Sequence, residues 1–343
     1  MALILICISA GVVAARGAET NGAVLRPFYI VGHNADTLSD VKAYLDWGAN
    51  ALEMDVDIFP GHSNELCIAH GPDLGIGPGK TNSPPLADYL KALHVLARTH
   101  TNLCLIIFDC KPLTTTPEGG AILLDDIRRY LVGAGDDRID LNTLISVGKI
   151  REKAMFSKIA GELGPHEGLI VDGEPNPAKV SAFFTSLNVQ NRAYSDGVGF
   201  FSTCLGHFQI WFSVKKACRL RDEDHRFRLV LTWTIDDPYL MTKFIKAGVD
   251  GILADWKFHP YNFSWANLGN GVRSLRRIVR EKGTALGIRL ANRDDNPFSI
   301  RDASTGGRED GASGSSKGFF ENQAMTRGII VTQCACQRIH HQK

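Results

Sequence analysis

Short β-rich runs alternate with amphipathic helical stretches along most of this 343-residue chain. In the helical stretches, of which PLADYLKALHVLART is an example, apolar residues recur at three- and four-residue spacing. We expect strands at residues 28–33, 51–59, 103–111, 143–148, 167–173, 192–197, 228–236 and 249–256. Eight strand–helix units predict an α/β fold, a single-domain (β/α)8 barrel of the TIM type. A doubly wound open sheet, the rival fold, would offer a glycine-rich phosphate turn after its first strand, where this chain has GHNADT.

The two ends of the chain differ from the expected barrel in composition. The run MALILICISAGVVAARGAET is apolar and ends in small residues, which predicts a signal peptide over residues 1–18. A buried N-terminal helix or a membrane anchor is the alternative, but the apolar stretch is shorter than the roughly 20 residues that a spanning helix needs. Residues 26–298 would form the catalytic barrel, and 299–343, rich in glycine, serine and charge, a disordered tail. We therefore expect a secreted, extracellular protein without a transmembrane segment.

Charge and cysteine content narrow the possible functions. The formal net charge is +1 and the pI about 7.6, without a polybasic block, so neither a nucleic-acid footprint nor an anionic-membrane footprint is indicated. Loss of Cys7 with the signal peptide leaves an odd number of cysteines, and we expect some of these to pair in an exported protein. Cys104 and Cys110 fall on one expected strand, too far apart to bond each other. Asn262 begins a glycosylation sequon.

One expected strand carries acidic side chains at alternate positions. In ALEMDVDIF, Glu53, Asp55 and Asp57 alternate with apolar residues. Because residues i and i+2 of a strand share a face, Glu53 and Asp55 converge at the barrel mouth, whereas we interpret Asp57 as a solvated residue past the strand end. Two ionised carboxylates this close repel each other unless they share a proton or a cation. With Asp109 from the neighbouring strand, three oxygen donors suit one Mg²⁺ ion.

Further polar residues fall at the carboxyl ends of the expected strands, where the active sites of (β/α)8 barrels lie. Each of them alone is as readily explained as a structural or surface residue, but their joint placement indicates a catalytic site. They are His33, His70 after a short hairpin, Lys111, Trp233, Asp236 and Asp255.

These strand ends lie within stretches that resemble a known family. The stretches are IVGHNADT, GANALEMDVD, AHG, IIFDCK, AYSDGV, LTWTIDD, AGVDGILADW and ANRDDNPF, spread over residues 28–298. They are similar to those of the arachnid sphingomyelinase D, or dermonecrotic toxin phospholipase D, proteins, which are distant relatives of glycerophosphodiester phosphodiesterases. The last stretch resembles that family's Asp-Asn-Pro-aromatic tail motif, which related phosphodiesterases generally lack.

The resemblance implies a role for each candidate residue. It implies catalysis by His33 and His70, with His33 expected as base or nucleophile and His70 as acid, an order that the sequence does not fix. It implies one magnesium ion held by Glu53, Asp55 and Asp109. The substrate-binding residues that it implies are Lys111 at the phosphate, Trp233 and Asp236 at the choline end, and Asp255.

The reaction implied by the resemblance is that of a secreted, Mg²⁺-dependent phospholipase D-type lyase. Such an enzyme, expected as a monomer, would act on sphingomyelin and lysophospholipids at membrane or lipoprotein surfaces, releasing choline and leaving a cyclic phosphate. Two alternatives stay open. One is a glycerophosphodiester phosphodiesterase that hydrolyses small diesters, and the other is a catalytically weak secreted lipid-binding protein.

The chain also departs from the family pattern. The loop HGPDLGIGPGK lacks the cysteines usual there, which leaves Cys204 without its expected partner. Asp255 stands where asparagine is common, and Leu231 where tyrosine is frequent. Four aromatic residues just beyond expected strand ends are candidates for lipid contact, namely Phe200, Phe201, Trp256 and Phe258.

Overall fold

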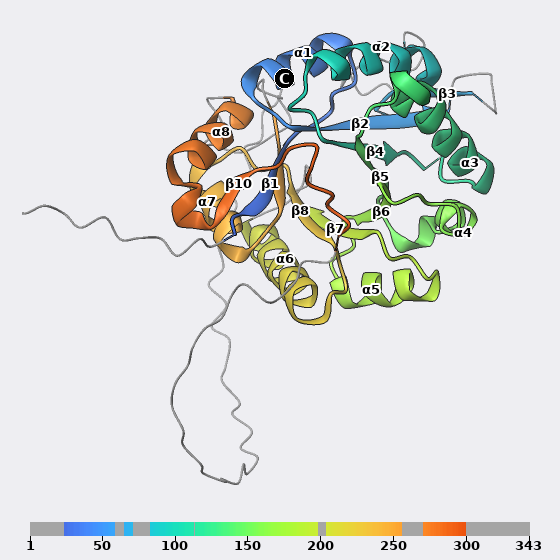
Figure 1. Cartoon of the computed structure of the whole chain (residues 1–343). Coiled ribbons are helices and arrows are strands. Elements are labelled where there is room, and N and C mark those ends of the chain that lie inside the picture. The colour runs from blue at the N-terminus through green and yellow to red at the C-terminus, as the bar shows by residue number, and fades with distance from the viewer. Residues whose placement is uncertain are drawn as a thin grey trace, which may run out of the picture. The chain divides into compact units, whose positions relative to one another are not determined.

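Eight parallel strands close into a barrel in the computed structural model of this chain (Figure 1). The structure describes residues 24–58, 65–70, 83–112, 114–197, 204–255 and 270–299, with the backbone alone for 204–208. Strand β1 pairs in parallel with both β2 and β9, and this double pairing closes the barrel. The barrel strands are β1 Arg26–Gly32, β2 Ala51–Ile58, β4 Leu105–Cys110, β5 Asn142–Val147, β6 Glu167–Asp172, β7 Arg192–Gly197, β8 Leu229–Trp233 and β9 Gly251–Ala254. The predicted (β/α)8 barrel is confirmed, and the open doubly wound sheet is excluded.

One α-helix follows each barrel strand and covers the outside of the barrel (Figure 1). The helices are α1 Leu38–Trp47, α2 Leu86–Thr99, α3 Pro117–Asp126, α4 Ala154–Ile159, α5 Pro177–Ser186, α6 Cys204–Asp224, α7 Pro238–Ala247 and α8 Gly271–Lys282. A π-helix, Ile127–Val132, continues α3, and 3₁₀ turns lie at Gly135–Asp137, Ile150–Glu152 and Thr284–Leu286. Local sequence sets the helix ends. At α7, for example, the Asp237 side chain accepts a hydrogen bond from the Leu240 amide, Pro238 begins the helix, and Gly248 ends it at φ 103°.

Two short strands extend the barrel sheet. Strand β3, Leu66–Ile68, pairs antiparallel with β2, which confirms the hairpin expected before His70. Strand β10, Ile288–Leu290, pairs in parallel with the first residues of β1. The first of these additions brings the segment carrying His70 beside the carboxyl end of β2.

The inside of the barrel changes from apolar to polar along the strands. An apolar inner cluster includes Val31, Ala51, Ile107, Leu231 and Leu253. Because side chains alternate between the two faces of a strand, the residue two positions further on faces the same interior. These next positions, at the carboxyl ends, are His33, Glu53, Asp109, Trp233 and Asp255. The strand register alone therefore gathers the candidate residues at one end of the barrel.

One residue on the acidic strand differs from its prediction. Asp57, which we expected to be solvated past the strand end, lies within β2 and is 2% exposed. The physical reason is the hairpin, because β3 pairs with the end of β2 and sets Cys67 opposite Asp57. Ile58, the last residue of β2, directly follows Asp57.

Several other predictions concern residues outside the described ranges. These are the signal peptide, the tail after residue 299, the sequon at Asn262, the four lipid-contact candidates and the side chain of Cys204. Within the described ranges, Cys104, Cys110 and Cys218 are buried free thiols, so Cys104 and Cys110 do not bond each other, as the sequence predicted. Among the described helices, none combines the length and apolar character required to cross a membrane.

Candidate active site

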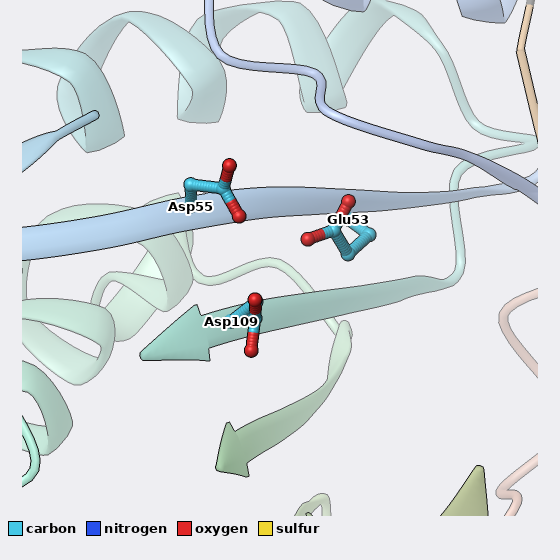
Figure 2. Close-up of side chains that lie close together, drawn as sticks. All are labelled: Glu53, Asp55 and Asp109. Atoms are coloured by element: carbon cyan, nitrogen blue, oxygen red, sulfur yellow. The ribbon is translucent and has the colours of Figure 1, made fainter. Parts of the chain in front are cut away.

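Three carboxylates from adjacent strands meet at the carboxyl end of the barrel. Glu53 and Asp55 lie on β2, and Asp109 lies directly opposite Asp55 on β4. One oxygen from each carboxylate lies within 4.8 Å of the other two, and the three side chains point toward one another in Figure 2. Glu53 is 4% and Asp55 0% exposed, so the negative charge is concentrated where water cannot screen it. The sequence prediction that these three side chains converge is confirmed.

The carboxylate cluster carries more negative charge than its neighbouring side chains neutralise. Burial and the charge of Asp55 raise the pKa of Glu53 well above its ordinary value. Burial also acts to raise the pKa of Asp109, but the Lys111 ammonium, with Nζ 2.6 Å from Asp109 Oδ2, lowers it overall. Lys111 Nζ also lies 2.5 Å from Asp55 Oδ1. A single ammonium therefore balances three carboxylates, which leaves room for further positive charge.

The donor set of the cluster fits a hard divalent cation. Within the described part of the chain, neither side-chain oxygen of Asp55 accepts a hydrogen bond of good geometry. Buried carboxylate oxygens are normally hydrogen-bonded, so these two oxygens, which among the described residues have only ion contacts with Lys111 and His70, are suited to serve as metal ligands. All three converging ligand atoms are oxygens, the preference of Mg²⁺ and Ca²⁺ rather than of softer metals.

His33 follows β1 and contacts a residue that follows the neighbouring strand β9. Its Nδ1 lies 2.9 Å from Oδ1 of Asp255, which follows β9 and is 2% exposed. Burial acts to lower the pKa of His33, but the charges of Asp255, Glu53 and Asp55 outweigh burial and raise the pKa to about 10. The Tyr44 hydroxyl donates to the His33 carbonyl, which fixes the backbone. The imidazole is therefore held by one ring nitrogen, and the other remains available to the cavity.

His70 follows β3 and lies next to Asp55 of the carboxylate cluster. Its Nε2 lies 3.7 Å from Asp55 Oδ2, and 30% of its side chain is exposed. Burial lowers the pKa of His70, and Lys111 and His33 act in the same direction against the opposing charge of Asp55. The two imidazoles thus have pKa values displaced in opposite directions, an arrangement common where one group gives a proton and another takes one.

A cavity of about 480 Å³ joins these groups. The predicted residues that line it are His33, Glu53, Asp55, His70, Asp109, Lys111 and Trp233. The cavity lining also includes Lys149, just after β5, and Asp172 and Asp196, at the ends of β6 and β7; the sequence analysis did not single out these three residues. A signal for the two aspartates was present, since the expected strands EGLIVDG and RAYSDG both end in Asp-Gly.

The wall opposite the metal cluster combines an aromatic ring with carboxylates. The Trp233 indole N–H donates to Asp172 Oδ1. Burial and the charge of Asp109 raise the pKa of Asp172 to about 7, although the Trp233 hydrogen bond opposes them. Lys149 donates from Nζ to the Gly173 carbonyl on the same wall. This side of the cavity therefore presents both an indole and an acidic group.

Two predicted substrate-binding residues lie behind the cavity rather than in its lining. Asp255 contacts His33, as described above. Asp236 follows β8, is 6% exposed, and its Oδ1 accepts a hydrogen bond from the Asp255 amide at 2.8 Å. The structure thus places both carboxylates next to the first histidine, with Asp236 supporting Asp255 and Asp255 supporting His33.

Comparison with known proteins agrees with the composition of this cavity. The family model described as dermonecrotic toxin SPH matches residues 23–298. Dermonecrotic toxin LarSicTox-betaID1 of Loxosceles arizonica is 23% identical over 305 residues, which cover 82% of this chain and 98% of that protein. Dermonecrotic toxin SPH of Ixodes scapularis is 26% identical over 252 residues, covering 67% of this chain and 68% of that protein.

Solved structures give a more distant likeness. A glycerophosphodiester phosphodiesterase from Parabacteroides distasonis is 17% identical, with a TM-score of 0.47 over 67% of this chain and 94% of its own. A phosphodiesterase from Oleispira antarctica in complex with sn-glycerol-3-phosphate is 16% identical, with a TM-score of 0.47 over 67% of this chain and 93% of its own. Because the family model spans nearly all of the barrel, this chain belongs to the dermonecrotic toxin SPH family of phospholipase D-type phosphodiesterases.

Proposed function

We propose that this protein is a secreted, Mg²⁺-dependent phospholipase D-type lyase that releases choline from sphingomyelin and choline lysophospholipids and forms a cyclic phosphate. The observation that carries the proposal is one cavity lined by two imidazoles, three converging carboxylates and a lysine. These are the groups that phosphodiester cleavage requires, because charge must be neutralised on phosphate and one proton must be removed while another is supplied. Family membership supports the same reaction class.

Glu53, Asp55 and Asp109 are the residues that would hold the magnesium ion. When bound, the ion supplies Lewis-acid stabilisation of the phosphate oxygens as their charge grows in the transition state. The protein contributes Lys111 to the same task, since its ammonium lies at the edge of the carboxylate cluster and faces the cavity. Magnesium is favoured over softer metals because the three ligand atoms are carboxylate oxygens.

His33 and His70 divide the proton transfers in this proposal. One takes the proton of the attacking hydroxyl, which belongs to the lipid itself, and the other protonates the departing choline oxygen. Asp255 fixes His33 through Nδ1, so Nε2 is the atom that exchanges protons with substrate. Both imidazoles line the cavity beside the carboxylate cluster, where an acid and a base can each reach a bound phosphodiester.

The opposite wall suits the cationic head group. Trp233 offers an aromatic face, and Asp172 and Asp196 offer negative charge in the same lining. A quaternary ammonium binds by both effects, because it has no N–H to donate and is attracted by aromatic faces and carboxylates. We therefore add Asp172 and Asp196 to Trp233 at the head-group end, with Asp236 acting from behind through Asp255.

Phosphorus NMR of the products tests the proposal most directly. With sphingomyelin and lysophosphatidylcholine as substrates, we expect cyclic phosphate signals and equimolar choline, both abolished by EDTA and restored by Mg²⁺. The variants His33→Ala and His70→Ala should be inactive, whereas the control His225→Ala, at an exposed position, should retain activity. An open monoester product would identify a hydrolase of the glycerophosphodiester type. Lipid binding without choline release by the folded, Mg²⁺-loaded protein would contradict the enzymatic proposal.

A further inference from the structure

Two exposed aromatic side chains lie on neighbouring helices on the outside of the barrel. Phe212 of α6 is 64% exposed and Tyr239 of α7 is 75% exposed. Among the described residues, the other large apolar side chains exposed by more than half are Val24 and Val95. Exposing aromatic rings to water is unfavourable, so two of them on adjacent helices indicate a surface that binds a partner or a membrane.

The helix packing connects the two aromatic residues into one surface. The Trp211 ring of α6 packs edge-on against Phe244 of α7, with centroids 5.7 Å apart. Lys243 Nζ lies 4.7 Å from the centre of the Trp211 ring and covers its outer face. Phe212 lies three residues before Lys215, whose Nζ is 6.0 Å from the centre of the Trp211 ring, and Tyr239 is one helical turn before Lys243 and so shares its face. Trp211, Phe212, Lys215, Tyr239 and Lys243 together form what we call the α6–α7 surface.

The charge on the α6–α7 surface is mainly positive, although the exposed residues Asp222, Glu223 and Asp224 end α6 and Asp237 precedes α7. Residues 204–221 and 238–247 contain no aspartate or glutamate. They contain five basic residues with exposed or half-exposed side chains, namely Lys215, Lys216, Arg219, Lys243 and Lys246. The sequence shows no basic block because these cations are divided between residues 215–219 and 243–246, which lie more than twenty residues apart, and the packing of α6 on α7 brings them together.

We infer that the α6–α7 surface is the site at which this protein docks on anionic phospholipid surfaces. Aromatic side chains with an apolar body favour the headgroup level of a bilayer, and nearby lysines are attracted to anionic lipid. Tyr239 lies in the first turn of α7, just after the segment from β8 that carries Asp236, so the surface begins at the catalytic rim of the barrel. The inference rests on the proposed function only in that the substrate is a lipid.

Vesicle co-sedimentation of the full chain in EDTA measures this docking without turnover. The probes are vesicles of phosphatidylcholine alone and of phosphatidylcholine with about 30 mol% phosphatidylglycerol, which supplies the negative surface potential. We expect stronger partitioning to the anionic vesicles, weakened as salt rises from about 0.05 to 0.5 M. The double variant Phe212→Ser/Tyr239→Ser should lose about tenfold or more in partitioning, because each lost ring removes its apolar contact with lipid.

Matched variants separate the parts of the surface. Lys215→Gln/Lys243→Gln should weaken binding to the anionic vesicles and leave binding to phosphatidylcholine unchanged. The control pair Lys91→Gln/Val95→Ser exchanges one lysine and one exposed apolar residue on α2 and should bind as the wild type does. Circular dichroism verifies that every variant is folded.

Activity assays distinguish this inference from the proposed function. Against a lysophospholipid below its micellar concentration, the surface variants should turn over substrate at the wild-type rate, whereas against anionic vesicles their rate should fall with their binding. Equal partitioning of wild type and Phe212→Ser/Tyr239→Ser would overturn the inference, as would wild-type binding that ignores anionic lipid and salt. Binding to an acidic protein without vesicle binding would also overturn it. Failure of the proposed function would instead show as vesicle binding with no turnover of either substrate.

Discussion

Replacing Asp255 by asparagine should lower the pKa of His33. The two side chains are linked by the 2.9 Å contact between His33 Nδ1 and Asp255 Oδ1, and Asp255 is almost fully buried. Asparagine has the same shape and retains an oxygen that can accept from Nδ1, so the substitution removes the charge and leaves the hydrogen bond possible. The change in pKa therefore isolates the electrostatic contribution of the carboxylate.

The size of the shift follows from the contributions at the site. The pKa of His33 rises from 6.5 to about 10 although burial opposes the rise, and Asp255 is the largest contributor in the upward direction. A direct ion pair typically shifts a pKa by about 1–3 units, so the pKa in Asp255→Asn should lie about that much lower. The remaining contributions come from Glu53 and Asp55, which a bound divalent cation would offset. We therefore expect the pKa to fall further when Mg²⁺ is added.

The same shift has a signature in stability. His33 has a raised pKa in the folded state, so the stabilisation is fully present below the ordinary value of 6.5 and is lost as pH rises through about 10. Asp255→Asn should thus destabilise the protein most at acidic to neutral pH and least near pH 10. Each unit of pKa corresponds to about 1.4 kcal/mol, and the 23% exposure of the His33 side chain places the expected loss at the lower end, about 1–2 kcal/mol.

NMR titration of the His33 ring in the metal-free protein is the direct assay. Thr234→Val is the matched control, because it removes a neutral group 3.4 Å from the same Nδ1 and should leave the pKa nearly unchanged. In the pH profile of kcat/KM, the limb that belongs to His33 should move to lower pH in Asp255→Asn, and whether that limb is acidic or alkaline identifies His33 as base or acid. A His33 pKa equal to that of the wild type would refute the reasoning.

Three further outcomes test other parts of the cavity. Asp109→Asn should weaken Mg²⁺ binding about tenfold or more in calorimetry, and unchanged affinity would show that Asp109 is not a metal ligand. The Mg²⁺ affinity of the wild type should also fall at acidic pH, because Glu53 becomes protonated. The pKa of Asp172 is raised from 3.8 to about 7, so ionisation of this carboxyl lowers the free energy of unfolding as pH rises through that range. Asp172→Asn should therefore stabilise the protein in urea denaturation by about 1–3 kcal/mol at pH 8 and hardly at pH 4. Gly197→Ala would place a Cβ against the Trp233 carbonyl oxygen, so calorimetry should show a lower Tm and a loss of about 2 kcal/mol or more. An unchanged Tm would mean that β7 and β8 are not packed this closely.

The fold was predictable because each barrel strand leaves a local pattern. Apolar runs of strand length separated by amphipathic helices identify all eight barrel strands, and alternation along β2 places Glu53 and Asp55 on the inner face. The ends of strands were less predictable, because they depend on pairing partners that are distant in sequence. Asp57 was assigned to solvent for this reason, since its burial depends on β3, which pairs across a hairpin with weak local signals.

The site was predictable on one side of the cavity and less so on the other. The residues at the metal side come from β1, β2 and β4, which carry unusual charge in apolar surroundings. Lys149 follows β5, and Asp172 and Asp196 lie at the ends of β6 and β7, where they look like ordinary polar residues at strand-to-helix turns. Only the closure of the barrel shows that they face the same space. The contacts of Asp255 with His33 and of Asp236 with Asp255 likewise depend on how the strands pair, which the spacing of residues along the chain does not reveal.

The charge of the cavity lining leads to a last prediction about substrate binding. Five carboxylates line the cavity against the two ammonium groups of Lys111 and Lys149, so once all five carboxylates are ionised the metal-free lining is negative even when His33 is protonated. A phosphodiester is itself an anion and would be repelled from such a space. Divalent metal should therefore be needed for binding as well as for turnover. In His33→Ala/His70→Ala, which removes the proton-transfer groups, a soluble phosphocholine ester should bind in calorimetry with Mg²⁺ present and lose that affinity in EDTA. Equal affinity in both conditions would mean that Lys111 and Lys149 alone hold the phosphate and that the carboxylates do not govern entry.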